Sequence, residues 1–212
     1  MEPFRFVDLV HLKELTGVKA STLKGLINIL RNAPDSIVHY HTHHFLEEPQ
    51  YLSLGPANDF AAWANDVFGD EILTKKLASI HISEFPTISA LRDRIIDIIE
   101  RHVSSVLEMR KAPEGKEFHF IKWVGIVLPT SRVAHDLGEF VEELGTLSLG
   151  SFYFHIVESR WRTDKASNDF SVWLDSLGKH ELAEATARLN PYTCSLEGVR
   201  SQLIKLATQR LK

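Results

Sequence analysis

Four closely spaced histidines are the feature of this sequence that most suggests chemistry. His39, His41, His43 and His44 fall within six residues of a segment that we expect to be helical. On a helix, His39 and His43 lie one turn apart, and His41 and His44 share another nearby face. Neutral imidazole is a common ligand of zinc, iron and copper, so both pairs have a spacing that suits a metal.

A repeat within the chain indicates which of these two histidine pairs is the better candidate for a metal site. When residues 4–41 are shifted by 114 positions, they align with residues 118–155 without a gap, and eight of the 38 aligned positions carry the same residue. The pattern N-D-F-x-x-W also occurs twice, beginning at Asn58 and at Asn168. The sequence therefore predicts an internal duplication.

The predicted boundaries of the two copies follow from this alignment. The first copy covers residues 1–110 and the second covers residues 118–212, and we expect them to pack as one unit with pseudo-two-fold symmetry. Between them, residues 111–117 are polar and charged and contain proline and glycine, which is typical of a linker.

In this alignment His41 corresponds to His155, and His44 corresponds to Glu158. If the two helices face each other, these four residues could supply the ligands of a divalent transition metal, as in helix bundles. His43 aligns with Val157, so it gains no repeated ligand and is kept as a candidate for binding a ligand or partner. The alternative for each of these histidines is the role that buried histidines have more often, that of a hydrogen-bonded residue in the packed interior.

The repeated Asn-Asp pairs allow two interpretations. Asp59 and Asp169 could form a pair of carboxylates for acid–base chemistry or could contact a ligand or partner. Asparagine and aspartate are also the residues that cap helix N-termini, and this interpretation is favoured here. The tryptophans that end the two patterns, Trp63 and Trp173, are then expected to be buried core residues.

Arg160 is the remaining candidate site residue. It stands in the run Arg160-Trp161-Arg162, which could bind an anion or stack on a base, although in an acidic protein a single short run of this kind is better explained as a solvated helix end. The chain contains no glycine-rich phosphate loop, G-x-S-x-G, H-E-x-x-H or C-x-x-C motif.

The predicted fold class is mainly α, in the α+β sense, with about five helices and one short strand in each copy. Residues 4–12 and 118–128 are rich in β-branched and aromatic residues and are expected to be the strands. Since a lone strand leaves its main-chain groups unpaired, we expect the two strands to pair with each other. Helices are expected over residues 23–30, 37–46, 59–68, 71–80 and 88–109, with a loop from Pro49 to Pro56 and the same order in the second copy.

Composition excludes several classes of function. The chain has 212 residues, 44% of them hydrophobic, which is ample for a core, and a formal charge of −4 argues against a nucleic-acid or membrane-surface partner. The start of the chain does not resemble a signal peptide, and no stretch is long and apolar enough for a membrane span, so we expect a cytoplasmic protein.

The sequence resembles a family of uncharacterised prokaryotic proteins known only as a domain of unknown function. The likeness lies in the Tyr40-His41-Thr42-His43 run, both N-D-F-x-x-W motifs, and the stretch from Leu189 to Tyr192 that leads into residues 196–200. It extends over nearly the whole chain and implies no activity.

Two functions therefore remain at this level. The favoured one is a non-catalytic binding or interaction protein, with either a protein or a small molecule as partner. The alternative is a metal-dependent enzyme or metal-binding protein that uses His41, His44, His155 and Glu158.

Overall fold

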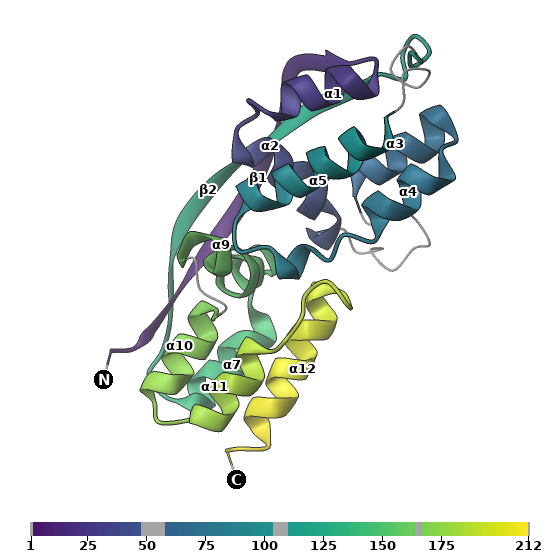
Figure 1. The fold of residues 1–212 in the computed structure, drawn as a ribbon. Coiled ribbons are helices and arrows are strands. Elements are labelled where there is room, and N and C mark those ends of the chain that lie inside the picture. Colours follow the sequence, from purple (N-terminus) through teal and green to yellow (C-terminus); the bar gives the residue numbers. More distant parts are fainter. Residues whose placement is uncertain (1, 48–57, 104–109, 164–166, 212) are drawn as a thin grey trace. The chain divides into compact units, whose positions relative to one another are not determined.

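The described part of the chain is mainly helical with one two-stranded sheet, which places the protein in the α+β class as predicted (Figure 1). The computed structural model describes residues 2–47, 58–103, 110–163 and 167–211. The chain forms two compact units. Unit 1 comprises Met1–His11, Leu46–Leu52 and Gly125–Lys212, and unit 2 comprises Leu12–Phe45 and Ser53–Val124.

The sheet consists of two strands, β1 (Phe4–Ala20) and β2 (Phe118–Ala134), which pair with each other as expected; their orientation is antiparallel. Each strand crosses from one unit to the other, since the unit boundaries fall after His11 and after Val124. Both strands are 17 residues long, so the prediction of short strands ending near residues 12 and 128 was wrong. The apolar alternation fades because the later residues are largely exposed, yet pairing with the other strand still satisfies the main-chain groups that point toward it.

The buried end of each strand follows the same pattern. In β1 the side chains of Phe4, Phe6 and Leu9 are buried, and in β2 the equivalent side chains are Phe118, Phe120 and Trp123. Aromatic rings of the same unit pack on them. In unit 2 the rings of Phe60 and Phe118 are stacked with centroids 5.1 Å apart, and in unit 1 those of Phe4 and Phe170 are 5.3 Å apart.

Unit 2 contains the first group of helices. They are α1 (Leu23–Leu30), α2 (Asp35–His43), the 3₁₀ turn η1 (His44–Glu47), α3 (Asp59–Phe68), α4 (Glu71–Ala78), the 3₁₀ turn η2 (Ile82–Glu84) and α5 (Ile88–His102). Only the first two residues of η1 belong to unit 2. Helix α5 ends at His102 rather than continuing toward residue 109, because Val103 is already extended. Residues 104–109 and the predicted loop from Pro49 to Pro56 lie outside the described residues.

Unit 1 contains the second group. They are α7 (Leu137–Thr146), α8 (Leu149–Tyr153), a π-helical segment η3 (Phe154–Glu158), α9 (Ser159–Thr163), α10 (Asp169–Ser176), α11 (His180–Ala187) and α12 (Leu196–Thr208). The segments α8, η3 and α9 follow one another directly and include the equivalents of α2. The order of helices therefore broadly follows that of the first group.

Several long-range contacts recur at positions 114 residues apart. Thr16 Oγ1 donates to the carbonyl of Phe120, and Thr130 Oγ1 donates to the carbonyl of Phe6. Arginines at the starts of α5 and α12 behave alike, since Arg92 donates to the carbonyl of Ala33 and Arg200 to that of Leu147, and these two acceptors are again 114 apart. Each of these contacts lies within a single unit.

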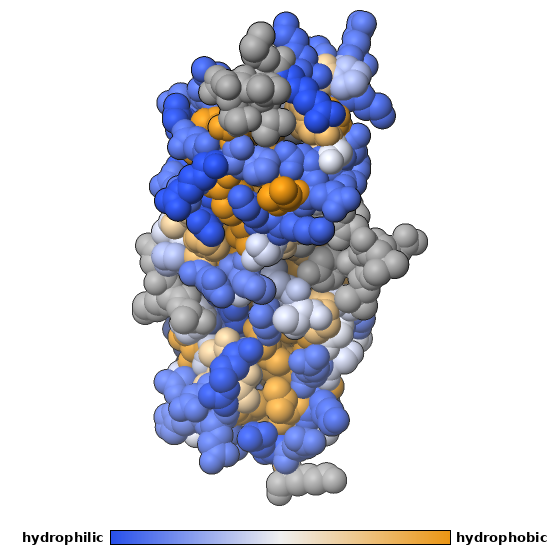
Figure 2. Space-filling model, turned by 45° about the vertical axis from the view of Figure 1, so that its right-hand side comes forward, coloured by the Kyte–Doolittle hydropathy of each residue, from blue (hydrophilic) through white to orange (hydrophobic). Residues whose placement is uncertain are grey.

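None of the described helices is long and apolar enough to cross a lipid bilayer. On the face seen in Figure 2, hydrophilic side chains predominate and hydrophobic side chains are visible in several places between them. Among the described residues, most of the exposed large apolar side chains belong to the strands: Val10, Leu12, Leu15, Val18, Val124, Ile126, Val127 and Leu128.

Candidate functional site

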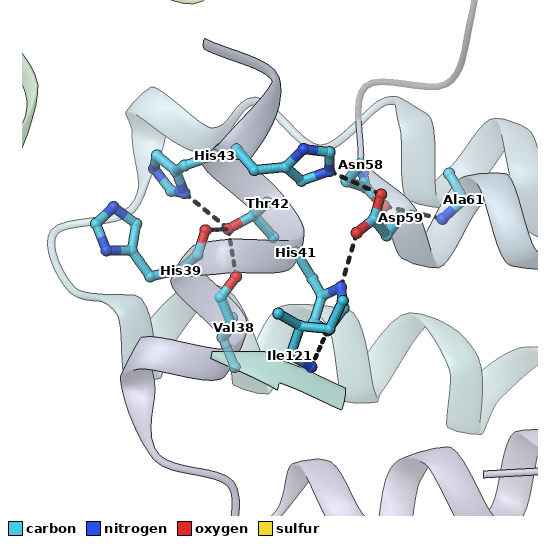
Figure 3. A network of polar contacts seen from close by, with 10 residues as sticks. Val38, His39, His41, Thr42, His43, Asn58, Asp59, Ala61 and Ile121 are labelled. Atoms are coloured by element: carbon cyan, nitrogen blue, oxygen red, sulfur yellow. Dashed lines mark hydrogen bonds and ion pairs between the residues drawn. The ribbon is translucent and has the colours of Figure 1, made fainter. Parts of the chain in front are cut away.

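His41 is held by hydrogen bonds at both ring nitrogens (Figure 3). Its Nδ1 lies 2.7 Å from Asp59 Oδ2, and its Nε2 lies 3.1 Å from the main-chain nitrogen of Ile121 on β2. A main-chain N–H can only donate, so Nε2 must accept and the proton of the neutral ring must sit on Nδ1, from which it is donated to Asp59. The side chain is only 3% exposed.

Asp59 also forms a hydrogen bond with a second imidazole, that of His44. Its Oδ1 lies 2.9 Å from His44 Nε2. Burial alone would raise the pKa of Asp59, but the hydrogen bonds from His41 and His44 outweigh it and lower this pKa to about 2. Burial also lowers the pKa of His41, against the opposing pull of Asp59. Near neutral pH the carboxylate is therefore ionised and His41 is neutral.

His155 has the same arrangement in unit 1. Its Nδ1 lies 2.9 Å from Asp169 Oδ2, and its Nε2 accepts the main-chain N–H of Val7 on β1 at 3.1 Å. The side chain is buried. Each histidine thus joins a strand to the first residue of a helix, α3 or α10, and we call this three-part arrangement a His–Asp clamp.

The clamps limit what these histidines can do chemically. A general base or a metal ligand needs a ring nitrogen with an available lone pair, and in His41 and His155 both nitrogens are engaged by protein groups. In the part of the chain that the structure describes, no three His, Cys, Asp or Glu side chains are grouped as metal ligands. The predicted site of His41, His44, His155 and Glu158 therefore gains no support from the geometry.

The Asn-Asp pairs divide two tasks between their residues. Asn58 caps α3 by accepting the N–H of Ala61, and Asn168 caps α10 by accepting that of Ser171, which confirms the capping prediction. The aspartate that follows each cap belongs to a clamp instead. The sequence indicated this second role only indirectly, because one residue is enough for a cap and both N-D-F-x-x-W motifs have two residues suited to it.

The tryptophans of the repeated motif are buried, as predicted, and each is 8% exposed. Trp63 Nε1 donates to the carbonyl of Lys116 at 2.8 Å, and Trp173 Nε1 donates to that of Glu2 at 3.2 Å. The two acceptors lie just before the strands. A second main-chain attachment therefore fixes the start of each strand to the same helix as the clamp.

His43 is a core residue rather than a surface ligand. Its side chain is buried, its Nδ1 lies 2.7 Å from Thr42 Oγ1, and its ring lies 4.6 Å from that of His39. Burial holds the pKa of His43 well below its ordinary value, so the ring is neutral at physiological pH.

Arg160 also serves the fold. Its Nη2 donates to the carbonyls of Ala187 and Leu189, both at 2.9 Å, where α11 ends. Burial lowers the pKa of this guanidinium. These bonds satisfy carbonyl groups that have no partner within the helix at its C-terminus. Donor groups of Arg160 that could have bound an anion are therefore already bonded to the main chain.

Sequence reasoning missed a pocket in unit 1. It has a volume of about 490 Å³ and lies where the start of β1 meets α10, between residues 2–5 and residues 167–176. Its lining includes the clamp residue Asp169, the charged residues Glu2 and Arg5, and the aromatic residues Phe4 and Trp173. The second N-D-F-x-x-W motif forms one wall of this pocket and could have drawn attention to it. The charged residues of the opposite wall, Glu2 and Arg5, are more than 160 positions away along the chain.

A family model matches residues 1–208, and its description is "Family of unknown function (DUF5752)". The chain belongs to this family. Membership confirms the resemblance seen in the sequence and brings no activity with it.

A solved structure, that of OrfY from Thermoproteus tenax, has a similar fold. Its sequence is 27% identical to that of this DUF5752 chain, and the two structures superpose with a TM-score of 0.82. The match covers 98% of this chain and 95% of OrfY. No curated protein matches the sequence.

Proposed function

We propose that this DUF5752 protein is a non-catalytic binding protein whose ligand is a small organic molecule carrying a cationic group. The pocket beside Asp169 is the observation that carries this proposal. A volume of about 490 Å³ lies in the range of pockets that hold metabolites, and its lining combines aromatic rings with a few charged groups.

The walls of this pocket are held before any ligand arrives. His155 fixes the carboxylate of Asp169, and the carbonyl of Glu2 fixes the indole of Trp173. The ring of Phe4 packs edge-on against that indole, with centroids 5.6 Å apart. Such preorganisation reduces the entropy lost when a ligand binds.

The charges of the lining favour a cation. Glu2 and Asp169 contribute two carboxylates, whereas Arg5 contributes one guanidinium, so the pocket carries a net negative charge. An ammonium or guanidinium group would gain from these carboxylates, and its apolar part would gain from Phe4 and Trp173. Arg5 would favour ligands that also carry one anionic group.

The proposal includes an internal duplication. The clamps of His41 and His155, the two asparagine caps and the two indole bonds recur in matching places, which supports descent from one repeated unit. On this view the clamp is the inherited part of the fold, and binding developed where one clamp borders a pocket.

Thermal-shift screening followed by calorimetry tests the proposal. Amines and guanidinium compounds should raise the melting temperature more than matched neutral or anionic compounds. Val172 lines the pocket and is 56% exposed, so Val172→Trp should block binding without unfolding the protein. Its matched control is Ala62→Trp, at the same motif position of α3. If both variants bind a hit equally well, the pocket is not its site.

Elemental analysis separates this proposal from a metal-dependent function. Because His41 and His155 have no ring nitrogen to spare, purified protein that has been exposed to zinc and dialysed should hold well below one equivalent. A stoichiometric metal that is lost on His41→Ala would favour the metal-binding alternative instead.

A further inference from the structure

The segment that leads into β1 forms one wall of the pocket in unit 1. Residues 2–5 line the pocket on this side, and α10 lines it on the other side with Asp169 and Trp173. Trp173 also ties the two walls together, because its Nε1 donates a hydrogen bond to the carbonyl of Glu2 at 3.2 Å. The indole is therefore both part of the pocket and one attachment between its walls.

A second attachment runs through a residue that does not line the pocket in the described part of the chain. The Nδ1 of His155 lies 2.9 Å from Asp169 Oδ2, and its Nε2 accepts the N–H of Val7 at 3.1 Å. The imidazole thus connects a carboxylate of one wall to the strand that continues from the other wall. We call residues 2–7 the wall segment, because both attachments end on it.

The ring of Phe4 lies between the two attachments. It lines the pocket, and its centroid is 4.9 Å from that of His155 and 5.6 Å from that of Trp173. Interactions that share a packing partner do not contribute independently to stability. If either attachment is lost, Phe4 gains freedom to move, and the other attachment should weaken with it.

Contacts beyond Val7 fix the strand that follows the wall segment. Ser151 Oγ donates to the carbonyl of Val7, and α8 lies so close to β1 at Gly150 that a Cβ there would collide with the main chain of the strand. Before Val7, the segment is held by β2, by the bond from Thr130 Oγ1 to the carbonyl of Phe6 and by the two attachments. Detachment therefore ends at Val7 and is a local opening, which costs less free energy than unfolding of unit 1.

We propose that the wall segment detaches and reattaches as one cooperative unit, and that a ligand in contact with both walls holds it attached. The part that concerns a ligand rests on the proposed function, whereas the cooperativity belongs to the ligand-free protein. His155 is then a positioning residue, since it acts on the ligand only through Asp169 and Val7. By linkage, a ligand that binds only the attached state stabilises this state, and a loosened segment lowers the affinity in return.

Trp173→Phe tests the cooperativity without any ligand. It keeps an aromatic ring and removes the hydrogen bond to Glu2. Amide exchange at Val7, followed by NMR, should become about fivefold faster, since one hydrogen bond no longer holds the segment attached. Amides in the middle of α12 should keep their wild-type rate, as should Val7 in the matched variant Trp63→Phe. A Val7 amide that exchanges at the wild-type rate in Trp173→Phe would overturn the proposal.

Agmatine, which carries an ammonium and a guanidinium group, is the probe for the ligand-bound state. At ten times its dissociation constant it should slow the exchange of the Val7 amide about tenfold and leave that of Ile121 in unit 2 unchanged. Binding without any change at Val7 overturns the coupling and leaves the proposed function in place. Failure of agmatine to bind counts against the proposed ligand class, and the Trp173→Phe result then decides the cooperativity alone.

Substitution of His155 tests its positioning role. His155→Ala removes both hydrogen bonds, whereas His155→Gln keeps a donor and an acceptor on one planar group. The affinity for agmatine should fall about threefold or more in the alanine variant and recover in the glutamine variant. His41→Ala makes the same change in unit 2 and should bind agmatine like the wild type. Equal affinity in the wild type and in His155→Ala, with both folded by circular dichroism, would show that His155 does not position the site.

Discussion

The two His–Asp clamps share their hydrogen bonds and differ in what surrounds them. In unit 2 the carboxylate of Asp59 accepts from both His41 and His44. In unit 1 the residue at the position of His44 is Glu158, so that second imidazole is replaced by a carboxyl group. The residues that recur in both units are those that attach strand to helix, whereas the residues at positions 44 and 158 differ in charge type.

The helices that carry the two histidines also wind differently. His41 lies in α2, which tightens into the 3₁₀ turn η1 at His44, while His155 lies in the π-helical segment Phe154–Glu158. Despite this, both rings reach a strand N–H at the same distance of 3.1 Å. The clamp geometry therefore tolerates either winding, and the comparison can be tested by making the same change in both units.

Removing the motif tryptophans should have the largest effect. Trp63→Ala and Trp173→Ala each delete a buried indole and its hydrogen bond to the segment that precedes a strand. We expect each to lower the free energy of unfolding by roughly 3–5 kcal/mol, measured by chemical denaturation. A loss below about 1 kcal/mol in either variant would mean that this indole is not a core residue.

Removing the clamp histidines should come next. His41→Ala and His155→Ala each leave a strand N–H without its acceptor and delete a hydrogen bond to a carboxylate. We expect a loss of about 2–4 kcal/mol in each unit. Hydrogen exchange at Ile121 and at Val7 gives a local readout, since each amide should exchange faster only in the variant that removes its own histidine.

The asparagine caps should contribute less. Asn58→Ala and Asn168→Ala remove the acceptor for a helix N–H and also a donor to the carbonyl of Leu77 or Thr186. We expect about 1–2 kcal/mol for each, by thermal or chemical unfolding. Asn→Asp keeps the acceptor and is the matched control. It should recover part of the loss, and an equal loss in both variants would contradict a capping role.

The smallest expected effect is the pH dependence of the unit 2 clamp. The pKa of Asp59 is about 2 in the fold, below its ordinary value of 3.8, so its stabilisation is present above about pH 4 and lost as pH falls toward 2. Its side chain is 34% exposed, so solvent screening leaves no more than about 1 kcal/mol. His41 acts in the same direction at higher pH, because its lowered pKa means that only the unfolded chain takes up the proton below about pH 6.5.

His44→Ala isolates the Asp59 contribution. Without this second imidazole, the pKa of Asp59 should return toward its ordinary value. The stability difference between wild type and variant should be largest above about pH 4 and shrink as pH falls through 2, where the carboxyl group becomes protonated in the wild type as well. Glu158→Ala in unit 1 is the matched control. A difference that is constant with pH would show that His44 acts by packing alone.

The sequence by itself determined the local features of both units. The N-D-F-x-x-W spacing places a cap, then two aromatic residues on the inner face of a helix, because caps and helical periodicity depend on residues a few positions apart. The same reasoning anticipated that His41 and His155 would be buried and hydrogen-bonded, since an unsatisfied buried imidazole is costly.

Only the tertiary structure decided what those residues are bonded to. The strand N–H groups that meet His41 and His155 lie 80 and 148 positions away along the chain, and a main-chain donor leaves no mark in the sequence. For the same reason the role of the aspartates, the continuation of the strands to Ala20 and Ala134, and the pocket formed with residues 2–5 were not predictable. Each depends on segments that are distant in the chain and adjacent only after folding.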